Sequence, residues 1–564
     1  MRRLNTLFVA LLVLIFVLSA CGTPATEAPA AEAPVAEAPA AEAPVAEAPA
    51  AEAPVEKVLT LIDPVVSTDW SPLRGGGQNV RQMSLMWAPP VWADMSGELH
   101  PMVFASWESS ADFITWTFKL DPAAKFSDGS PITATDVKGT WELATQPLTK
   151  HQRVGLFLSG IVGYDEAVAG NSTELPGVVA QDDATVVVTL KSPDPIFVNR
   201  IATNLVGPVK ISQARGADGQ EIAEWWTPAN GVVTSGPYTP VAMDLTTGSV
   251  ELAPNPNWFG SAPKLSKINI IAVEDGAAAL LMMKNGEADI NMSSDLPTTF
   301  EELGADYVGT TLPATPVLQV FWFNGKIAPM DDLNCRKALI LAANPVELFK
   351  ASHPNGPGEA GSTLLAQILG DKETNQAYTN NAEGAKAAFA ECSYKDAMPK
   401  LYVAGASNPQ AEVAAQALVE QWRQVLGIQE TELVPAMDKL PKTEQDKVQV
   451  FRDDVGARIF DAPTLLSGSI YSGAGNAQGK MGGYKNDAVD ALILEASALA
   501  PTDAARISKS IEAEKLAMDD FMWINWYDEG PTMHAMPWVI NYSRNIDWQI
   551  VEPWNLDIDL SKKP

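Results

Sequence analysis

Residues 105–142 read ASWESSADFITWTFKLDPAAKFSDGSPITATDVKGTWE and decide the fold of this chain. In the first half of the stretch, large apolar side chains occupy every second position: Ile114, Trp116, Phe118 and Leu120. Alternation of this kind predicts a β-strand with one buried face. The pair Asp128-Gly129 follows and favours a turn, because glycine adopts positive φ without steric penalty.

A helix is expected directly after that turn. Thr133 and Asp136 have the spacing of a capping box, in which each side chain accepts a hydrogen bond from the other residue's backbone. Val137 and Trp141 lie four residues apart, as they would on the buried face of a helix. The stretch therefore predicts a strand, a turn and a helix in succession.

Composition limits the remaining possibilities. With 564 residues the chain is too long for one ordinary core, so we expect two or three subdomains. The formal net charge of -30 argues against nucleic acid as a partner, because so acidic a protein cannot present a broad basic surface. The chain contains 3 Cys and 4 His, which leave little material for metal chemistry, and we expect no metal site and no cofactor.

The start of the chain has the features of an export signal. Two arginines precede an apolar run over residues 7–18, which is too short for a comfortable membrane span. The run ends in LSACG at 18–22, which resembles the bacterial lipobox, whose cysteine is lipidated and becomes the new N-terminus. We therefore expect a signal peptide at 1–20 and lipidation at Cys21, because two acyl chains make a lasting tether. The protein would then be exported and anchored at the outer face of the cell membrane or in the periplasm.

A repeated decapeptide follows the proposed anchor. Residues 21–56 are dominated by EAPAAEAPVA, which starts at Glu27, Glu37 and Glu47. Regular proline and glutamate favour an extended, self-repelling chain over a packed core. We expect a disordered stalk here, with the folded protein beginning near Lys57.

Longer patterns link the chain to a known family. The opening stretch contains SWE-x-S-x-D-x-x-x-W-x-F-x-L and then K-F-x-D-G-x-P-I-T-A-x-D-V. Three further motifs follow in order: TSGPY at 234–238, GEADI at 286–290 and FNGKIAPMDD at 323–332. Together they resemble the bacterial extracellular solute-binding proteins of family 5, the oligopeptide/dipeptide/nickel-binding class of ABC importers.

The resemblance implies an α/β fold of the two-lobed periplasmic-binding-protein kind (type II), with an extra subdomain in the first lobe. It places lobe 1 at 57–316 with the insert at about 95–230, lobe 2 at 317–529, and a return to lobe 1 at 530–564. The implied function is that of a monomeric, membrane-anchored receptor. It would capture a peptide or similar polar solute between its lobes and deliver it to the permease and ATPase subunits of an importer.

One loop departs from the family pattern. Peptide-binding members carry W-x-a-D-x-x-(D/E)-P, and the resemblance assigns its Asp to the α-ammonium group of the substrate. Here 455–463 reads VGARIFDAP, so a gapless alignment puts Arg458 at that position and retains Asp461. Arginine favours carboxylates, phosphates or sugar hydroxyls over an ammonium group. The solute is therefore either a peptide, with Asp453, Asp454 or Asp461 as its anchor, or an oligosaccharide or another neutral polar solute, or else an anion or a metal chelate.

Two tryptophans and two cysteines complete the set of candidate residues. Trp87 and Trp322 fall near the expected cleft, where they could stack on a ligand, and a place in the core is the alternative for both. Cys335 and Cys392 fall in one expected lobe and in an oxidising compartment, so they either form a disulfide or are two buried thiols. The candidate ligand contacts are Trp87, Trp322, Arg458 and Asp461.

Motifs of the main rival class, the secreted hydrolases, do not occur. The sequence contains no H-E-x-x-H and no G-x-S-x-G, and its four histidines are scattered. The segment GAGNAQGKM at 473–481 has neither the spacing nor the hydroxyl group of a phosphate-binding loop. We expect a binding protein and not an enzyme, with a structural or adhesion protein on a stalk as the other alternative.

Overall fold

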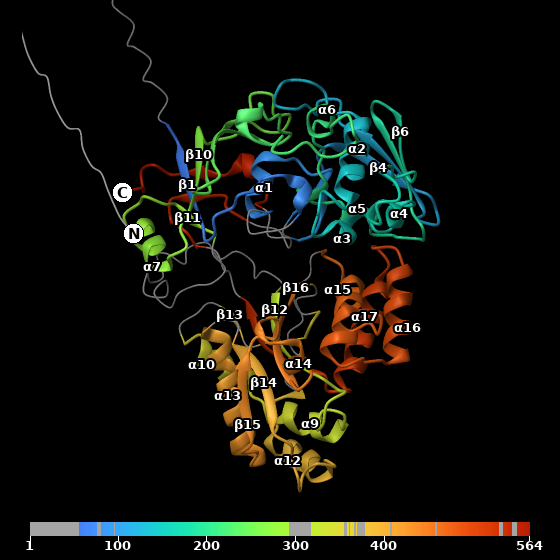
Figure 1. Cartoon of the computed structure of the whole chain (residues 1–564), viewed down its shortest axis with the longest axis vertical. Coiled ribbons are helices and arrows are strands. Elements are labelled where there is room, and N and C mark those ends of the chain that lie inside the picture. The colour runs from blue at the N-terminus through green and yellow to red at the C-terminus, as the bar shows by residue number, and fades with distance from the viewer. Residues whose placement is uncertain are drawn as a thin grey trace, which may run out of the picture. The chain divides into compact units, whose positions relative to one another are not determined.

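The chain folds around separate β-sheets (Figure 1), and clusters of buried apolar side chains pack against them. One core draws on residues from 59 to 292 and from 535 to 558, and we call this part lobe 1. Two further clusters draw on residues from 318 to 526, which we call lobe 2. The structure, a computed structural model, describes residues 56–75, 80–94, 96–292, 317–354, 358–359, 361, 363–365, 368, 378–406, 409–456, 459–529, 534–543 and 550–564.

Lobe 1 is built on a six-stranded sheet in the order β18-β11-β1-β10-β9-β8. Its strands are β1 (Val58–Asp63), β8 (Tyr238–Asp244), β9 (Ser249–Pro254), β10 (Lys267–Ala272), β11 (Ile290–Asn291) and β18 (His534–Ala535). β1 runs parallel to β10 and β11, and β18 pairs with β11 in the antiparallel sense. The last part of the chain therefore completes the sheet with which the folded part begins.

A second sheet of lobe 1, in the order β4-β5-β7-β6, lies within the part expected to be an inserted subdomain. Its strands are β4 (Phe104–Ser109), β5 (Thr115–Leu120), β6 (Val178–Asp182) and β7 (Thr185–Thr189). The helices of lobe 1 are α1 (Val80–Met86), α2 (Ala134–Thr145), α3 (Val154–Leu158), α4 (Tyr164–Val168), α5 (Phe197–Arg200), α6 (Ile211–Ala214) and α7 (Gly276–Lys284). Two small pairs complete the lobe: β2 (Val91–Ala93) with β3 (Leu99–Pro101), and β19 (Val539–Ile540) with β20 (Asp557–Ile558).

The local predictions for residues 105–142 are confirmed except at Ile114, which precedes β5 and is only half-buried. The buried side chains of β5 are Trp116, Phe118 and Leu120, so the strand has one buried face. Gly129 takes a φ of 84°, which the turn requires. The capping box forms as predicted: the Thr133 side chain accepts a bond from the Asp136 backbone, and Asp136 accepts one from the Thr133 backbone.

Lobe 2 surrounds a mixed six-stranded sheet in the order β13-β17-β12-β16-β14-β15. Its strands are β12 (Val317–Phe323), β13 (Gly358–Glu359), β14 (Leu401–Ala406), β15 (Thr431–Pro435), β16 (Val450–Gly456) and β17 (Trp523–Glu529). Its helices are α9 (Leu333–Ala342), α10 (Pro345–Ser352), α12 (Ala382–Glu391), α13 (Pro409–Leu426), α14 (Lys442–Gln445), α15 (Ala462–Ser469), α16 (Asp487–Ala498) and α17 (Ala504–Met518). Figure 1 shows α15, α16 and α17 grouped together, apart from α10 and α13, which lie along the sheet. The architecture is the predicted α/β, two-lobed one.

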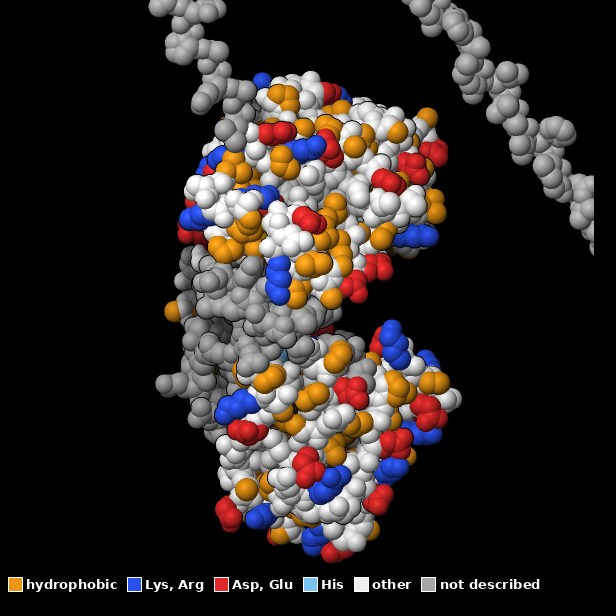
Figure 2. All heavy atoms as spheres, turned by 90° about the vertical axis from the view of Figure 1, so that its left-hand side faces the viewer, with side chains coloured by type: hydrophobic (Ala, Val, Ile, Leu, Met, Phe, Trp, Pro, Cys, Tyr) orange, Lys and Arg blue, Asp and Glu red, His pale blue; other side chains and the backbone are white. Residues whose placement is uncertain are grey.

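The face of the molecule shown in Figure 2 carries charges of both signs together with scattered hydrophobic side chains. On the face shown in Figure 2, acidic and basic side chains are interspersed among neutral ones over the parts that are coloured. Within the described ranges, every helix falls short of the length and apolar character that crossing a bilayer demands.

Histidine 151 is buried in lobe 1 in its neutral form. Its Nε2–H donates to the Leu205 carbonyl at 3.1 Å, and its Nδ1 accepts from the Arg153 backbone N–H at 3.1 Å. The ring packs against Gly75, whose positive φ and missing Cβ leave the space that it fills. Burial lowers the pKa of His151 from 6.5 to about 4, and protonation would remove the acceptor that Arg153 uses.

We therefore expect acid to destabilise lobe 1 through His151. The group has a lowered pKa in the folded state, so its contribution is complete above about pH 6.5 and is lost as the pH falls through about 4. Across this window the free energy of unfolding should fall by about 3 kcal/mol, because each unit of pKa shift corresponds to about 1.4 kcal/mol. Denaturant titrations from pH 7 to pH 4 should show a shallower fall for His151→Gln than for the wild type. Parallel pH profiles for the two proteins would contradict this assignment.

Candidate functional site

One edge of strand β16 is open at its carboxyl end. β12 pairs with β16 along its whole length, from Phe323 opposite Val450 to Val317 opposite Gly456. On the other side, β14 pairs only with Val450 and Phe451. Among the described residues no strand pairs with this second edge of β16 beyond Phe451. Among the described residues, the edge from Asp453 to Gly456 therefore offers backbone N–H and C=O groups to an added strand.

A pocket of about 290 Å³ lies directly beside this open edge. Lobe 2 contributes the end of β16 and one side of α15, from Thr464 to Ser469, and lobe 1 contributes residues of α3 and α5. The apolar part of its wall is formed by Leu156, Val455, Ile459 and Leu465. The charged part is formed by Arg200 and Asp454, one from each lobe. The pocket thus combines opposite charges, apolar surface and available backbone.

Asp454 and Arg200 differ in how they are held. Arg200 donates from Nε to Asp194 Oδ2 at 2.6 Å, which fixes the guanidinium at the end of α5. Asp454 is exposed, and within the described part of the chain its carboxylate has no hydrogen-bond or ion-pair partner. It is therefore the acidic group of the pocket wall that is free to bind a cation.

Asp461 has a structural role beside the same pocket. It is the N-cap of α15, where Oδ2 accepts bonds from the Thr464 backbone N–H at 3.1 Å and the Thr464 hydroxyl at 2.6 Å. Arg506 of α17 also donates to both of its carboxylate oxygens, at 2.8 Å each. Both side chains are buried, with 8% of Asp461 and 2% of Arg506 exposed. Asp461 thus holds the helix that lines the pocket and leaves neither oxygen free for a solute.

Sequence comparison now decides the family. Residues 98–477 match the bacterial extracellular solute-binding proteins, family 5. The chain belongs to this family. Its relatives are likewise named as binding proteins.

Curated relatives of this family-5 protein are named for peptides. The periplasmic oligopeptide-binding protein OppA of Salmonella typhimurium is 25% identical over 468 residues, which is 80% of this chain and 83% of the relative. The oligopeptide-binding protein OppA of Bacillus subtilis is 27% identical over 337 residues, 57% of this chain and 60% of the relative. The relationship to the first of them extends over most of both chains.

Solved structures show the same fold. The periplasmic murein tripeptide-binding protein MppA, in its unliganded open form, superposes with a TM-score of 0.75 at 22% identity, covering 89% of this chain and 98% of the other. The substrate-binding protein CtaP of Listeria monocytogenes gives a TM-score of 0.72 at 20% identity, with coverage of 89% and 99%. The two-lobed architecture is therefore that of the family.

The structure places both candidate tryptophans in the core of this solute-binding protein. Trp87 is 1% exposed and packs against Trp225, with 5.4 Å between ring centroids. Trp322 is fully buried, and its Nε1 lies 3.3 Å from Asp453 Oδ2. Asp453 also pairs with Lys480. Neither indole lines the pocket. Of the two alternatives for each tryptophan, ligand stacking or a place in the core, both therefore take the place in the core.

Two predicted site residues lie outside the described residues. They are Arg458, at the ammonium-binding position of the gapless alignment, and Cys21, the expected lipidation site. Their roles stay predictions.

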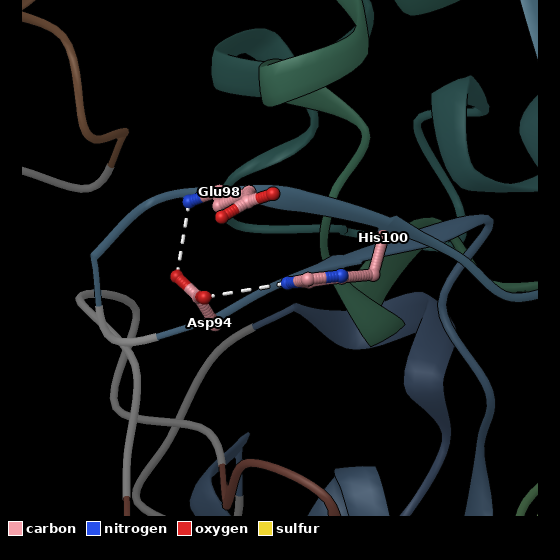
Figure 3. Close-up of side chains that lie close together, drawn as sticks. All are labelled: Asp94, Glu98 and His100. Carbon is pink, nitrogen blue, oxygen red and sulfur yellow. Dashed lines mark hydrogen bonds and ion pairs between the residues drawn. The ribbon is translucent and has the colours of Figure 1, made fainter.

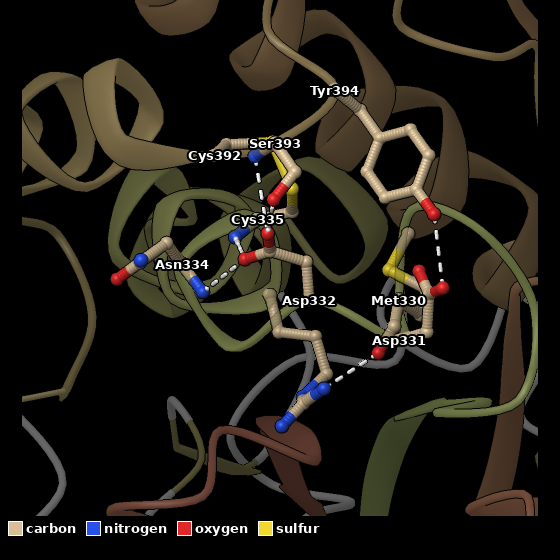
Figure 4. The surroundings of a disulfide bond; sticks show 9 residues. Met330, Asp331, Asp332, Asn334, Cys335, Cys392, Ser393 and Tyr394 are labelled. Carbon is tan, nitrogen blue, oxygen red and sulfur yellow. Dashed lines mark hydrogen bonds between the residues drawn. A yellow bond between two sulfur atoms is a disulfide. The ribbon is translucent and has the colours of Figure 1, made fainter.

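A disulfide joins the two cysteines of lobe 2 (Figure 4). Cys335 lies in the first turn of α9 and Cys392 is the C-cap of α12, with their Cα atoms 4.8 Å apart. Asp332 supports the junction: Oδ1 caps α9 by accepting from the Cys335 backbone at 3.2 Å, and Oδ2 accepts from the Ser393 backbone at 3.1 Å. The bond thus ties together two helices that pack against each other.

Sequence reasoning missed the lobe 1 side of the pocket. Arg200 and Leu156 belong to short helices with no distinctive motif, and no signal in the sequence marks them. The structural role of Asp461 did have a signal, because Asp461 followed by Ala462 and Pro463 is a typical helix start, with an N-cap acid and proline in the first turn.

Proposed function

We propose that this protein is the receptor of an ABC importer and captures a peptide in the pocket beside β16. The observation that carries the proposal is the open edge of β16 next to a pocket wall with opposite charges. A peptide offers the matching groups in every residue, since its backbone can add to a sheet edge while its side chains enter adjacent space. Sugars and small anions lack such a backbone.

Asp454 is the proposed anchor for the α-ammonium group of the peptide. A buried ammonium group requires an acidic partner, because removing it from water unpaired is very unfavourable. Among the acids that the sequence offered, Asp453 pairs with Lys480 and Asp461 with Arg506, whereas Asp454 faces the pocket. Arg200, on the opposite wall, is suited to a carboxylate.

The relatives support this assignment of substrate and role. Proteins named for oligopeptides align over most of the chain, and proteins named for peptides share its fold. Capture would proceed by closure of the two lobes, which requires that the peptide bind the closed form better than the open one. ATP hydrolysis would belong to separate subunits of the importer.

Export and lipid anchoring complete the proposal. The sequence LSACG at 18–22 supports acylation at Cys21, and the name of the Salmonella relative states that it is periplasmic. Residues 21–56 would then space the folded part from the membrane. Mass spectrometry of the protein extracted from membranes should find a diacylglyceryl group on Cys21, and an unmodified cysteine there would contradict the anchor.

The binding proposal predicts the effect of one substitution. We expect Asp454→Asn to weaken binding of free oligopeptides by about 10- to 100-fold, because a hydrogen bond to a charged group contributes about 1.5–3 kcal/mol. Isothermal titration calorimetry with free and N-acetylated forms of the same peptides measures this directly. The wild type should prefer the free form, and Asp454→Asn should bind both forms alike.

Asp446→Asn is the matched control, since Asp446 is an exposed acid of the same lobe outside the pocket. It should leave both affinities unchanged. If Asp454→Asn kept the full preference for free peptides, Asp454 would not be the anchor. If the wild type bound oligosaccharides and no peptide, the receptor would serve the alternative class of solute.

A further inference from the structure

The tip of the β2–β3 hairpin brings together three potential metal-ligating side chains that do not line the solute pocket. Asp94 follows β2, Glu98 precedes β3 and His100 lies within β3 (Figure 3). One ligand atom from each lies within 4.8 Å of the other two. In the described ranges, no other group of three or more His, Cys, Asp or Glu residues meets this spacing.

The register of the hairpin places all three side chains on one face. Asp94 and Glu98 are directly opposite, and the Asp94 N–H donates to the Glu98 carbonyl at 3.0 Å. Glu98 and His100 are two residues apart along one strand, so they share a face. Two carboxylates directly opposite each other in a β-pair repel. A cation between them would turn this repulsion into attraction.

The distances and supporting contacts suit a transition metal. Asp94 Oδ2 and His100 Nε2 are hydrogen-bonded at 3.3 Å, and this separation is also about that of two ligands on a tetrahedral ion with bonds of about 2.0–2.1 Å. Asp94 Oδ1 is held by the Ser96 N–H at 2.8 Å and the Glu98 N–H at 3.0 Å. Trp92 stacks on the imidazole with 4.3 Å between centroids. These contacts orient the ligands before an ion arrives.

We propose that this hairpin tip binds one divalent transition-metal ion of the Zn²⁺ class through Asp94, Glu98 and His100. The imidazole nitrogen favours such ions over Mg²⁺ and Ca²⁺, which prefer oxygen ligands. About a third of the side-chain surface of Asp94 and His100 is exposed, so solvent has access to the ion and completes its coordination.

The position of the hairpin gives a bound ion a structural effect. Gly97, at the tip, lies so close to Phe460 of lobe 2 that an added Cβ would be 2.6 Å from its ring. An ion that cross-links β2 and β3 would stiffen their hairpin and so hold Gly97 in place against Phe460. The ion would act on the hairpin whether or not a solute occupies the pocket beside β16.

Calorimetry of the full chain without an affinity tag tests the site with Zn²⁺ alone. We expect one Zn²⁺ per chain, and Co²⁺ in the same site should give a visible absorption band. Glu98→Gln and His100→Ala should each weaken Zn²⁺ binding by about 100-fold or more, since even residues behind the ligands change affinity by about 10–100-fold. Glu98→Gln is the cleaner variant, because its exposed side chain supports no other described contact.

Glu108→Gln is the matched control, since Glu108 is an exposed acid of neighbouring strand β4 and lies outside the cluster. It should leave Zn²⁺ affinity unchanged. The proposal is overturned if the wild type takes up no stoichiometric Zn²⁺, if Ca²⁺ binds more tightly than Zn²⁺, or if Glu98→Gln and His100→Ala bind Zn²⁺ as the wild type does.

Discussion

Replacing Arg506 with alanine is expected to lower the free energy of unfolding by about 3–5 kcal/mol, the effect of removing one partner from a buried ion pair. Arg506 donates two bonds to Asp461, which would be left buried without its cation. It also donates from Nη1 to three carbonyls around the end of α16: Ala496, Ser497 and Leu499. One side chain of α17 thus secures the start of α15 and the end of α16.

Chemical denaturation of the full chain measures this effect, and Lys509→Ala is its matched control. Lys509 lies on the same helix and pairs with Glu495 at 2.6 Å, but both side chains are substantially exposed. Exposed pairs contribute about 0–1 kcal/mol, so this variant should be near neutral. Equal destabilisation by the two substitutions would contradict a special role for the buried pair.

A double-mutant cycle separates the pair from the other contacts of Arg506. Asp461→Ala/Arg506→Ala should lose less stability than the sum of the two single variants, because the double variant leaves no unpaired buried charge. The bonds from Arg506 to the end of α16 are lost in both Arg506 variants. Strict additivity would mean that the two side chains do not depend on each other.

The features that could be predicted from the sequence are those set by near neighbours. The capping box of Thr133 and Asp136 and the turn at Gly129 depend on residues within a few positions, so the local pattern determined them. The alternation in β5 was equally local. The division into two lobes came from the resemblance to a family, since no short-range pattern contains it.

The candidate site depended on contacts that the sequence does not display. Asp461 and Arg506 are 45 residues apart, so the acid looked available until the fold supplied its partner. Trp322 could stack on a ligand or fill the core, and its place in β12 buries it. Asp94 and His100 meet only because β2 and β3 pair in one register, which explains why four scattered histidines gave no prediction of a metal site.

Removing the disulfide of lobe 2 is the second large effect that we expect. Cys335→Ala/Cys392→Ala should lower the free energy of unfolding by about 4 kcal/mol, because the bond closes a loop with a sequence separation of 57 and so restricts the unfolded chain. Denaturation with and without a reductant gives the measurement and its control together. Reductant should lower the stability of the wild type toward that of the variant and leave the variant itself unchanged.

Since both cysteines are almost fully buried, part of the loss in the variant comes from packing, and reduction of the wild type isolates the part due to the cross-link. A variant as stable as the oxidised wild type would show that the α9–α12 junction holds without the bond, through Asp332 and the packing of the two helices.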